Sequence, residues 1–463
     1  MRYSPDHSSG SAAPAGDLET LARDGVEAAL AAGAGDAEAW VESSTSRQIR
    51  IYDGEVESLS DSGGRGIGIR AFIDGRTGYA YGTDLEPGGL RAVAQRAHAL
   101  AAVADPDRYA GLPDETGTTD VAGLESAAMA DWSTEHKVEL ALAVDHAARS
   151  RAGVTQVENT VYSDGEGTAA IANSRGFAAS SASTQAWAYS SAFAGEGEDL
   201  MTGMGIGLGR DPGELDAEAI GLEAADRALA LVGARQPSSR RCPVVLDAFV
   251  AASFAGFIGG MLSADAVQRG RSLFAGREGQ EVAERAFALT DDGRHPDGPA
   301  SAPFDGEGAA TRRTPLIAAG KVDGYLYDSR TARKDGRATT GNAGRGSYRS
   351  QPSVGTHNLI VEPGSGGLQD LVAEAGEGLY VTEVSGLHSG VNPVSGTFSV
   401  GASGRLIEGG ELGAPVREIT IASDLVSMLK AVRAVGGEPR WIPLGGSVQA
   451  VPLLIGEMSV SGS

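Results

Sequence analysis

The sequence predicts an α+β fold in two domains, an N-terminal mixed sheet with packed helices and a C-terminal domain that is mostly β with a few helices. Its 463 residues exceed what one ordinary hydrophobic core organises, which favours two domains. The 67 glycines, the 5% aromatic content and the many glycine-rich turns indicate short, closely spaced strands. We expect a disordered tail over residues 1–16, an N-terminal domain over 17–236 and a C-terminal domain over 237–463.

The composition excludes several classes of partner. A net charge of −23 repels nucleic acid and anionic lipid, so we expect no nucleic-acid partner. No uncharged run reaches the length of a membrane span, and the N-terminus lacks a basic and apolar leader, so we expect no membrane partner either. The single cysteine, Cys242, forms no internal disulfide. Together these features predict a cytoplasmic protein.

The first part of the chain is expected to be a helix followed by an antiparallel meander. Asp17 caps the helix and Gly33 ends it, with apolar residues at helical spacing between them. Asp-Gly dipeptides at 53–54 and 74–75 predict tight hairpins, because these residues tolerate positive φ. Strands are expected at residues 37–44, 47–52, 56–59, 66–73 and 77–81, and helices at 90–101 and 133–150.

A second β region is expected next, with strands at residues 155–162, 168–173 and 177–193. Asp164-Gly165 resembles the earlier turns and predicts another one. Residues 201–209 alternate glycine with apolar side chains. A dinucleotide-binding loop would need a following acidic ribose ligand at the required distance, so the alternation favours a strand. A helix at 215–232 and a linker at 236–239 close the domain.

The C-terminal domain is expected to begin with a buried strand at 242–246, an N-cap at Asp247 and an apolar helix at 248–262. Gly256, Gly259 and Gly260 on this helix would let another backbone approach closely. Further strands are expected at residues 315–318, 324–328, 358–362, 379–384, 398–402, 405–408 and 416–422, with one late helix at 423–435.

No self-contained catalytic apparatus is visible in the sequence. A metallopeptidase helix needs two histidines about one turn apart, and none of the seven histidines is three or four positions from another. Neither a G-x-S-x-G elbow nor a phosphate-binding loop occurs. Asp305 and Glu307 could be paired acids or hydrogen-bonding turn residues. Glu383 and His388 could serve as a proton shuttle or as ordinary loop residues.

The stretch at 376–404 carries a family resemblance. Two segments resemble the C-terminal signature of the TldD/PmbA family of peptidase-related proteins. They are Leu-Tyr-Val-Thr-Glu at 379–383 and Gly-Leu-His-Ser-Gly-Val-Asn-Pro-Val-Ser-Gly-Thr-Phe-Ser at 386–399. Further matches occur in order along almost the whole chain, at residues 32–38, 66–70, 78–79, 303–308, 332–334, 340–344 and 418–422.

The resemblance implies a branch without a metal. In the TldD branch, a helix with H-E-x-x-x-H supplies two histidine ligands and a glutamate, and a late cysteine supplies a third ligand. Those positions fall on Ala255, Gly256, Gly260 and Leu444, which bring no ligating side chain. The chain therefore resembles the PmbA or TldE branch. We expect no metal or other cofactor here, and zinc or iron in a TldD-type partner.

This resemblance implies a non-catalytic subunit of a heterodimeric metallopeptidase that processes small or unfolded peptides, including antibiotic or other modified-peptide precursors. Thr382, Glu383, Ser385 and His388 are the candidate residues for binding the peptide substrate. Two alternatives stay open. The chain could be a stand-alone hydrolase with a site around Glu383 and His388, or a homodimeric peptide-binding protein.

Overall fold

The N-terminal half is organised by one six-stranded antiparallel sheet in the order β3-β2-β1-β4-β5-β6. The structure is a computed structural model and describes residues 15–443 and 446–462. The strands are β1 (Asp36–Tyr52), β2 (Glu55–Ile73), β3 (Arg76–Gly82), β4 (Val154–Asn173), β5 (Ala178–Ala194) and β6 (Met201–Gly209). The helices are α1 (Ala15–Ala31), α2 (Pro87–Val103), α3 (Thr134–Ser150) and α4 (Ala217–Leu229).

Local turn chemistry sets both hairpins of the first meander. Asp53 and Gly54 have φ of 51° and 76°, and Asp74 and Gly75 have φ of 48° and 74°, which confirms the predicted tight turns. Helix α1 begins at Ala15, two residues before the predicted cap, a difference within the usual uncertainty of helix ends. The rest of the predicted tail, residues 1–14, lies outside the described residues.

The strands are longer than the sequence predicts, and Asp164-Gly165 is not a turn. The pairing of β1 with β4 continues without a break through Arg47 opposite Asp164 and Ser46 opposite Gly165. Asp164 is buried, and its carboxylate lies 2.6 Å from Nζ of Lys137 on α3. A partner distant in sequence thus stabilises the acid within a strand, where local pattern alone indicates a bend.

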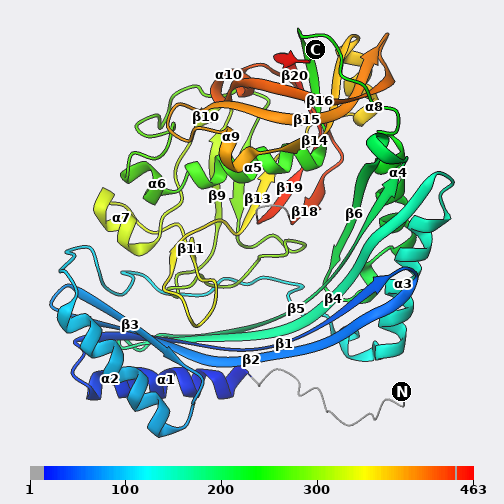
Figure 1. The fold of residues 1–463 in the computed structure, drawn as a ribbon. Coiled ribbons are helices and arrows are strands. Elements are labelled where there is room, and N and C mark those ends of the chain that lie inside the picture. Colours follow the sequence, from blue (N-terminus) through cyan, green and yellow to red (C-terminus); the bar gives the residue numbers. More distant parts are fainter. Residues whose placement is uncertain (1–14, 444–445, 463) are drawn as a thin grey trace.

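Helices cover the convex face of this curved sheet, and the C-terminal half lies over its concave face (Figure 1). Two apolar clusters fill the space beneath the helices, one under α1 and α2 and one under α3 and α4. The predicted strand at residues 201–209 is confirmed as β6. Its alternating glycines allow helix α4 to pack closely against the sheet. A Cβ at Gly205 would overlap the carbonyl oxygen of Ile220, so only glycine lets α4 approach this closely.

The C-terminal half contains two further six-stranded sheets, in the orders β16-β15-β14-β7-β20-β17 and β10-β9-β8-β13-β19-β18. Their strands are β7 (Arg240–Leu246), β8 (Leu289–Asp292), β9 (Arg313–Ala318), β10 (Lys321–Val322), β13 (Asn358–Val361), β14 (Gly378–Ser385), β15 (Thr397–Glu408), β16 (Glu411–Asp424), β17 (Val432–Val435), β18 (Arg440–Ile442), β19 (Ser447–Ala450) and β20 (Leu453–Ser461). The α+β class is confirmed.

Helix α5 (Ala248–Met261) contacts strands of both C-terminal sheets and lies at the centre of this half (Figure 1). Around it stand α6 (Ala264–Gln268), α7 (Ser329–Asp335), α8 (Leu368–Ala375), α9 (Leu387–Gly390) and α10 (Leu425–Lys430). Within the described residues, no backbone segment approaches Gly259 or Gly260. The neighbour of Gly259 is the Leu359 side chain, and Gly260 faces open space.

Two predictions for this half are corrected by long-range pairing. Residues 423–435 do not form one helix, because α10 ends at Lys430 and β17 then pairs with β20, Val432 opposite Ile455. Residues 324–328 form no strand and contribute one isolated bridge, from Leu326 to Ser263. None of the helices in the described ranges is long and apolar enough to cross a membrane.

Candidate functional site

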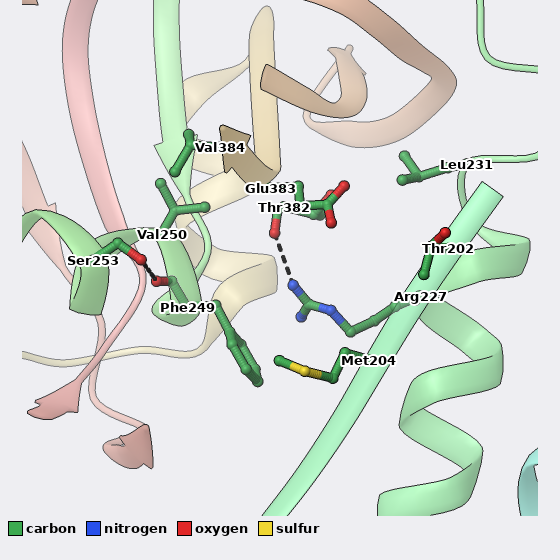
Figure 2. Close-up of a pocket in the computed structure, with 11 residues that line it drawn as sticks. Thr202, Met204, Arg227, Leu231, Phe249, Val250, Ser253, Thr382, Glu383 and Val384 are labelled. Carbon is green, nitrogen blue, oxygen red and sulfur yellow. Dashed lines mark hydrogen bonds between the residues drawn. The ribbon is translucent and has the colours of Figure 1, made fainter. Parts of the chain in front are cut away.

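A pocket of about 200 Å³ lies where the end of the N-terminal sheet meets α5 and β14 (Figure 2). We call it the junction pocket. Four elements line it, and they come from both halves of the chain. Its lining residues are Thr202, Gly203, Met204, Arg227, Leu231, Phe249, Val250, Ser253, Thr382, Glu383 and Val384.

Asp247 holds the C-terminal part of this pocket together. Strands β7 and β14 run parallel, so their carboxyl ends meet at one edge, where Asp247 begins α5. Its side chain accepts the N–H of Phe249 at 2.9 Å, as predicted for an N-cap, and the hydroxyl of Tyr380 donates to it at 2.5 Å. Burial, and then the Asp247 carboxylate, raise the pKa of Tyr380. The phenol therefore stays a hydrogen-bond donor at neutral pH.

Arg227 of α4 links the N-terminal half to this frame. Its guanidinium donates to the carbonyl of Thr382 at 2.8 Å, lies 3.4 Å from the Asp247 carboxylate and stands 4.4 Å from the ring centroid of Phe249. The cation, an acid and an aromatic face are thus fixed together at the pocket wall. Figure 2 shows the Met204 side chain facing the same ring.

Glu383 is the acidic group of the junction pocket. A β-bulge between Val381 and Glu383 in the pairing with β15 leaves Thr382 as the extra residue, which redirects the following side chain. Glu383 is exposed by surface area, but the pocket walls desolvate its carboxyl group and raise its pKa, while Arg227 acts in the opposite direction. An acid with a raised pKa beside a fixed cation can accept or share a proton.

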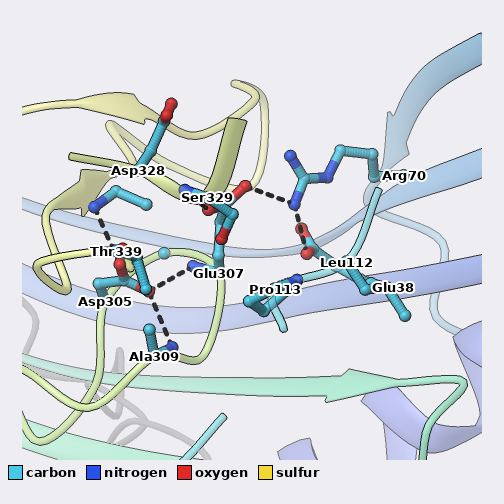
Figure 3. A network of polar contacts seen from close by, with 12 residues as sticks. Glu38, Arg70, Leu112, Pro113, Asp305, Glu307, Ala309, Asp328, Ser329 and Thr339 are labelled. Carbon is cyan, nitrogen blue, oxygen red and sulfur yellow. Dashed lines mark hydrogen bonds and ion pairs between the residues drawn. The ribbon is translucent and has the colours of Figure 1, made fainter. Parts of the chain in front are cut away.

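A second junction between the two halves is filled with charged side chains (Figure 3). Arg70 of β2 contacts Glu38 of β1 at 2.6 Å and Glu307 of the C-terminal half at 3.0 Å, and Arg345 contacts Glu38. We call these four residues the buried quartet. Their side chains are at most 9% exposed, and the two cations balance the two anions. Burial alone would lower the pKa of Arg70, but the carboxylates outweigh it and raise the pKa.

Asp305 and Glu307 act in this second junction as hydrogen-bond acceptors. Asp305 accepts the N–H groups of Glu307, Ala309 and Ala343 at 2.9, 3.0 and 2.9 Å, and so shapes the loop. Burial, and then Glu307, raise the pKa of Asp305 to about 7. Burial also acts to raise the pKa of Glu307, but Arg70 and the N–H of Ser329 prevail and lower it. The geometry is that of a structural loop with every oxygen engaged.

Comparison with known proteins identifies the family. Models of the PmbA/TldA metallopeptidase domain 1, central domain and C-terminal domain match residues 37–101, 129–232 and 239–462. The chain is 30% identical to the metalloprotease PmbA of Escherichia coli O157:H7, over 94% of each chain. The chain belongs to the PmbA/TldD family. A PmbA homolog of Haemophilus influenzae is 29% identical, over 95% of this chain and 94% of that one.

The fold of this PmbA/TldD family member is shared with solved structures. TldE from Thermococcus kodakarensis superposes with a TM-score of 0.87 at 23% identity, and the match covers 96% of this chain and 100% of that one. The family models divide the N-terminal half at a point where the structure shows one continuous sheet, since β1 pairs with both β2 and β4.

Helix α5 presents an open face beside the junction pocket. Ser253, Gly256 and Gly260 follow one another at helical spacing and are partly or fully exposed, whereas Ala255 is 2% exposed. The ligand positions implied by the TldD branch thus offer no nitrogen, oxygen or sulfur side-chain atom on this helix, and these residues do not fit a catalytic metal ion. The remaining position, Leu444, lies outside the described residues.

Among the described residues, no group of three or more His, Cys, Asp or Glu side chains is arranged to hold a metal ion. Of the candidate substrate residues, Thr382 and Glu383 line the junction pocket. Ser385 at the end of β14 and His388 on α9 are exposed and do not line it. His388 lies instead beside a shallow hollow formed by residues 389–393 and 397–399.

Sequence reasoning missed the pocket residues Arg227, Phe249 and Met204. They stand on a helix, a helix start and a strand that the sequence places correctly, but no motif marks them. Only the fold brings Arg227 to the carbonyl of Thr382, 155 positions away.

Proposed function

We propose that this chain is the metal-free, PmbA/TldE-type subunit of a two-chain metallopeptidase. A TldD-type partner would carry the catalytic zinc or iron, and the complex would act in the cytoplasm. Its substrates would be small or unfolded peptides, including antibiotic and other modified-peptide precursors. Relatives named metalloprotease PmbA support the peptidase-related role.

The observation that carries the proposal is the open face of α5. This face borders a pocket with an acid and a cation, yet Ala255, Gly256 and Gly260 stand where the resembling branch has ligands and a base. Amide hydrolysis near neutral pH needs an activated water or nucleophile. We therefore assign the reaction to the partner and substrate holding to this chain.

The end of β14 suits the holding of an extended peptide. Residues 378–381 and 383–385 pair with β15, but on the other side only 379–381 pair with β7. From Thr382 onward, that second side has no strand partner within the described residues. The carbonyl of Thr382 accepts from Arg227, and the next backbone groups are free to pair with a peptide. Glu383 and Arg227 would then orient its charged or polar groups.

The test is co-expression with a TldD-type chain, followed by light scattering, elemental analysis and a peptide-cleavage assay. The chain alone should contain far less than one transition metal per molecule and cleave no peptide. The mixture should form a 1:1 complex whose cleavage a chelator abolishes. Cleavage by the chain alone that survives a chelator would favour the stand-alone hydrolase instead. Stoichiometric metal in the dialysed chain would also contradict the proposal.

A further inference from the structure

A second hollow, of about 340 Å³, lies on the concave face of the N-terminal sheet, apart from the junction pocket. We call it the Trp40 pocket. Strands β1, β4 and β5 form its floor, and a loop of the C-terminal half covers one side. Its lining residues are Trp40, Glu42, Ser43, Ser44, Gly167, Thr168, Ala169, Ser181, Ser183, Ser301, Ala302 and Phe304. The volume is within the range of small-molecule sites.

The strand register explains why the sheet is hollow here. Glu42 pairs across the sheet with Ala169, which pairs with Ser181, and on its other side with Gly66. In the next row, Ser44 stands beside Gly167, Ser183 and Gly64. Directly paired residues point to the same face. Glu42 is therefore the one long side chain in two rows of small residues.

Aromatic rings close one end of the Trp40 pocket. Trp40 and Phe304 meet edge to face, with ring centroids 6.2 Å apart, and Phe304 is 3% exposed. The guanidinium of Arg345 covers part of Trp40 but is held by Glu38 and by the carbonyl of Gly306. The rings are therefore fixed in place and give an apolar wall to a ligand.

Glu42 is the only charged residue that lines the Trp40 pocket, and it has no ion-pair partner in the described chain. Its Oε2 accepts the indole N–H of Trp40 at 3.2 Å. Arg349 attracts it electrostatically but is fully solvated and bound to the Tyr348 hydroxyl. The buried quartet, by contrast, leaves no charge unbalanced. A half-buried carboxylate with free acceptor positions favours a cationic ligand group.

We propose that the Trp40 pocket binds the lysine or arginine side chain of an extended peptide. The aliphatic stem would lie against Trp40 and Phe304, and the cationic head would meet Glu42. The hydroxyls of Ser44, Ser181 and Ser183 would receive its remaining donors. The net charge of −23 attracts such a ligand from a distance. That the ligand is a peptide rests on the proposed function; the cation preference rests on the pocket.

The test measures binding of capped, dye-labelled pentapeptides to the chain alone by fluorescence anisotropy. The central residue is lysine, arginine, norleucine or citrulline, so that each cation has a neutral match of similar shape. Lysine and arginine peptides should bind about tenfold more tightly than their neutral matches, and salt should reduce this difference. The amine 1,5-diaminopentane, as competitor, should bind more weakly than the lysine peptide.

Two variants separate charge from shape. Glu42→Gln keeps an acceptor for the Trp40 N–H and should remove the preference for lysine over norleucine. Gly167→Val should block the pocket, because it adds a branched side chain to the lining. The variant should still fold, because the new Cβ would lie an ordinary 3.9 Å from Ser44 and valine suits a strand. Glu374→Gln, on the exposed face of α8, changes net charge equally and should leave binding unchanged.

Equal binding of lysine and norleucine peptides, or unchanged selectivity in Glu42→Gln, would overturn the inference. Binding of the diamine as tight as that of the peptide would make the pocket a small-cation site instead. Because the assay omits the TldD-type partner, its failure leaves partner-dependent cleavage standing. If the chain bound the lysine and arginine peptides selectively but the complex cleaved no peptide, the cation preference of the Trp40 pocket would be supported and the proposed function would be wrong.

Discussion

The buried quartet and the junction pocket both lie between the two halves of the chain and contain similar residues, but they have different roles. The buried quartet and the junction pocket each bring an arginine of the N-terminal half to a carboxylate of the C-terminal half. In the quartet, Arg70 touches two carboxylates and the space is filled. In the pocket, Arg227 touches one carboxylate at 3.4 Å and about 200 Å³ stays open.

This difference separates a structural contact from a binding site. A buried charge without a partner is costly, so a closed set of compensated charges fixes how two surfaces meet. An open cavity with an acid of raised pKa leaves interaction capacity for a ligand. The titratable groups alone would not show this, because Asp305 in the structural junction also has a raised pKa. The decisive observation is whether the carboxylate oxygens already accept hydrogen bonds, as those of Asp305 and Glu307 do.

The largest effect is expected from breaking the quartet. Arg70→Met leaves Glu307 buried without its cation and should lower the free energy of unfolding by about 3–5 kcal/mol, measured by urea denaturation. Arg227→Met should cost about 1 kcal/mol, because the Asp247 carboxylate keeps its hydrogen bonds from Phe249 and Tyr380. The control is Arg241→Met, whose pair with Glu457 is exposed and should contribute less than about 1 kcal/mol. Equal losses at Arg70 and Arg227 would erase the distinction.

A second effect concerns pH. Burial raises the pKa of Asp305 to about 7 and that of Asp291 to about 6. The unfolded chain releases these protons near a pH of about 4, whereas the folded chain keeps them up to a pH of about 6 at Asp291 and about 7 at Asp305. Stability from these groups should therefore fall as pH rises, by several kcal/mol in total. Glu307, with its lowered pKa, acts oppositely at lower pH.

Urea titrations at several pH values measure this slope, and Asp305→Asn should flatten it between pH of about 4 and 7. The three backbone N–H groups bound to Asp305 favour its charged form. A slope that is flat in the unmodified chain would show that these donors dominate over burial.

How far sequence predicts this molecule depends on the range of the interactions. The hairpins at 53–54 and 74–75 and the cap at Asp247 are local, and all three are confirmed. Asp164-Gly165 has the same local pattern as the hairpins, but Lys137 and the long pairing with β1 keep it extended. Residues 432–435 likewise join a strand because β20 is available.

The candidate site follows the same rule. Thr382 and Glu383 line the junction pocket. The family resemblance could predict both residues, because they lie in one continuous stretch of sequence. The pocket also needs Arg227 and Phe249, which stand on separate elements. No pattern around either residue signals that it faces the other.

A smaller effect is expected within the junction pocket. In a complex with a TldD-type partner, Glu383→Gln and Arg227→Met should each lower kcat/KM by about 3–10-fold, mainly through KM, because they hold substrate without reacting. Steady-state rates with one peptide measure this, and Glu374→Gln is the matched control. A loss of about 10²–10⁴-fold in kcat for Glu383→Gln would make that residue a catalytic acid or base.

The smallest effect should come from His388→Ala. His388 is exposed on the four-residue helix α9, outside the junction pocket, and its side chain makes no hydrogen bond or ion pair to the described part of the chain. Its removal should leave the partner's metal in place and change kcat/KM by less than about threefold, depending on the peptide. A proton shuttle with Glu383 would require His388 to approach the pocket. If His388→Ala abolished cleavage while the metal content stayed constant, α9 would have to move onto the site during turnover, and the open junction would be only one state of it.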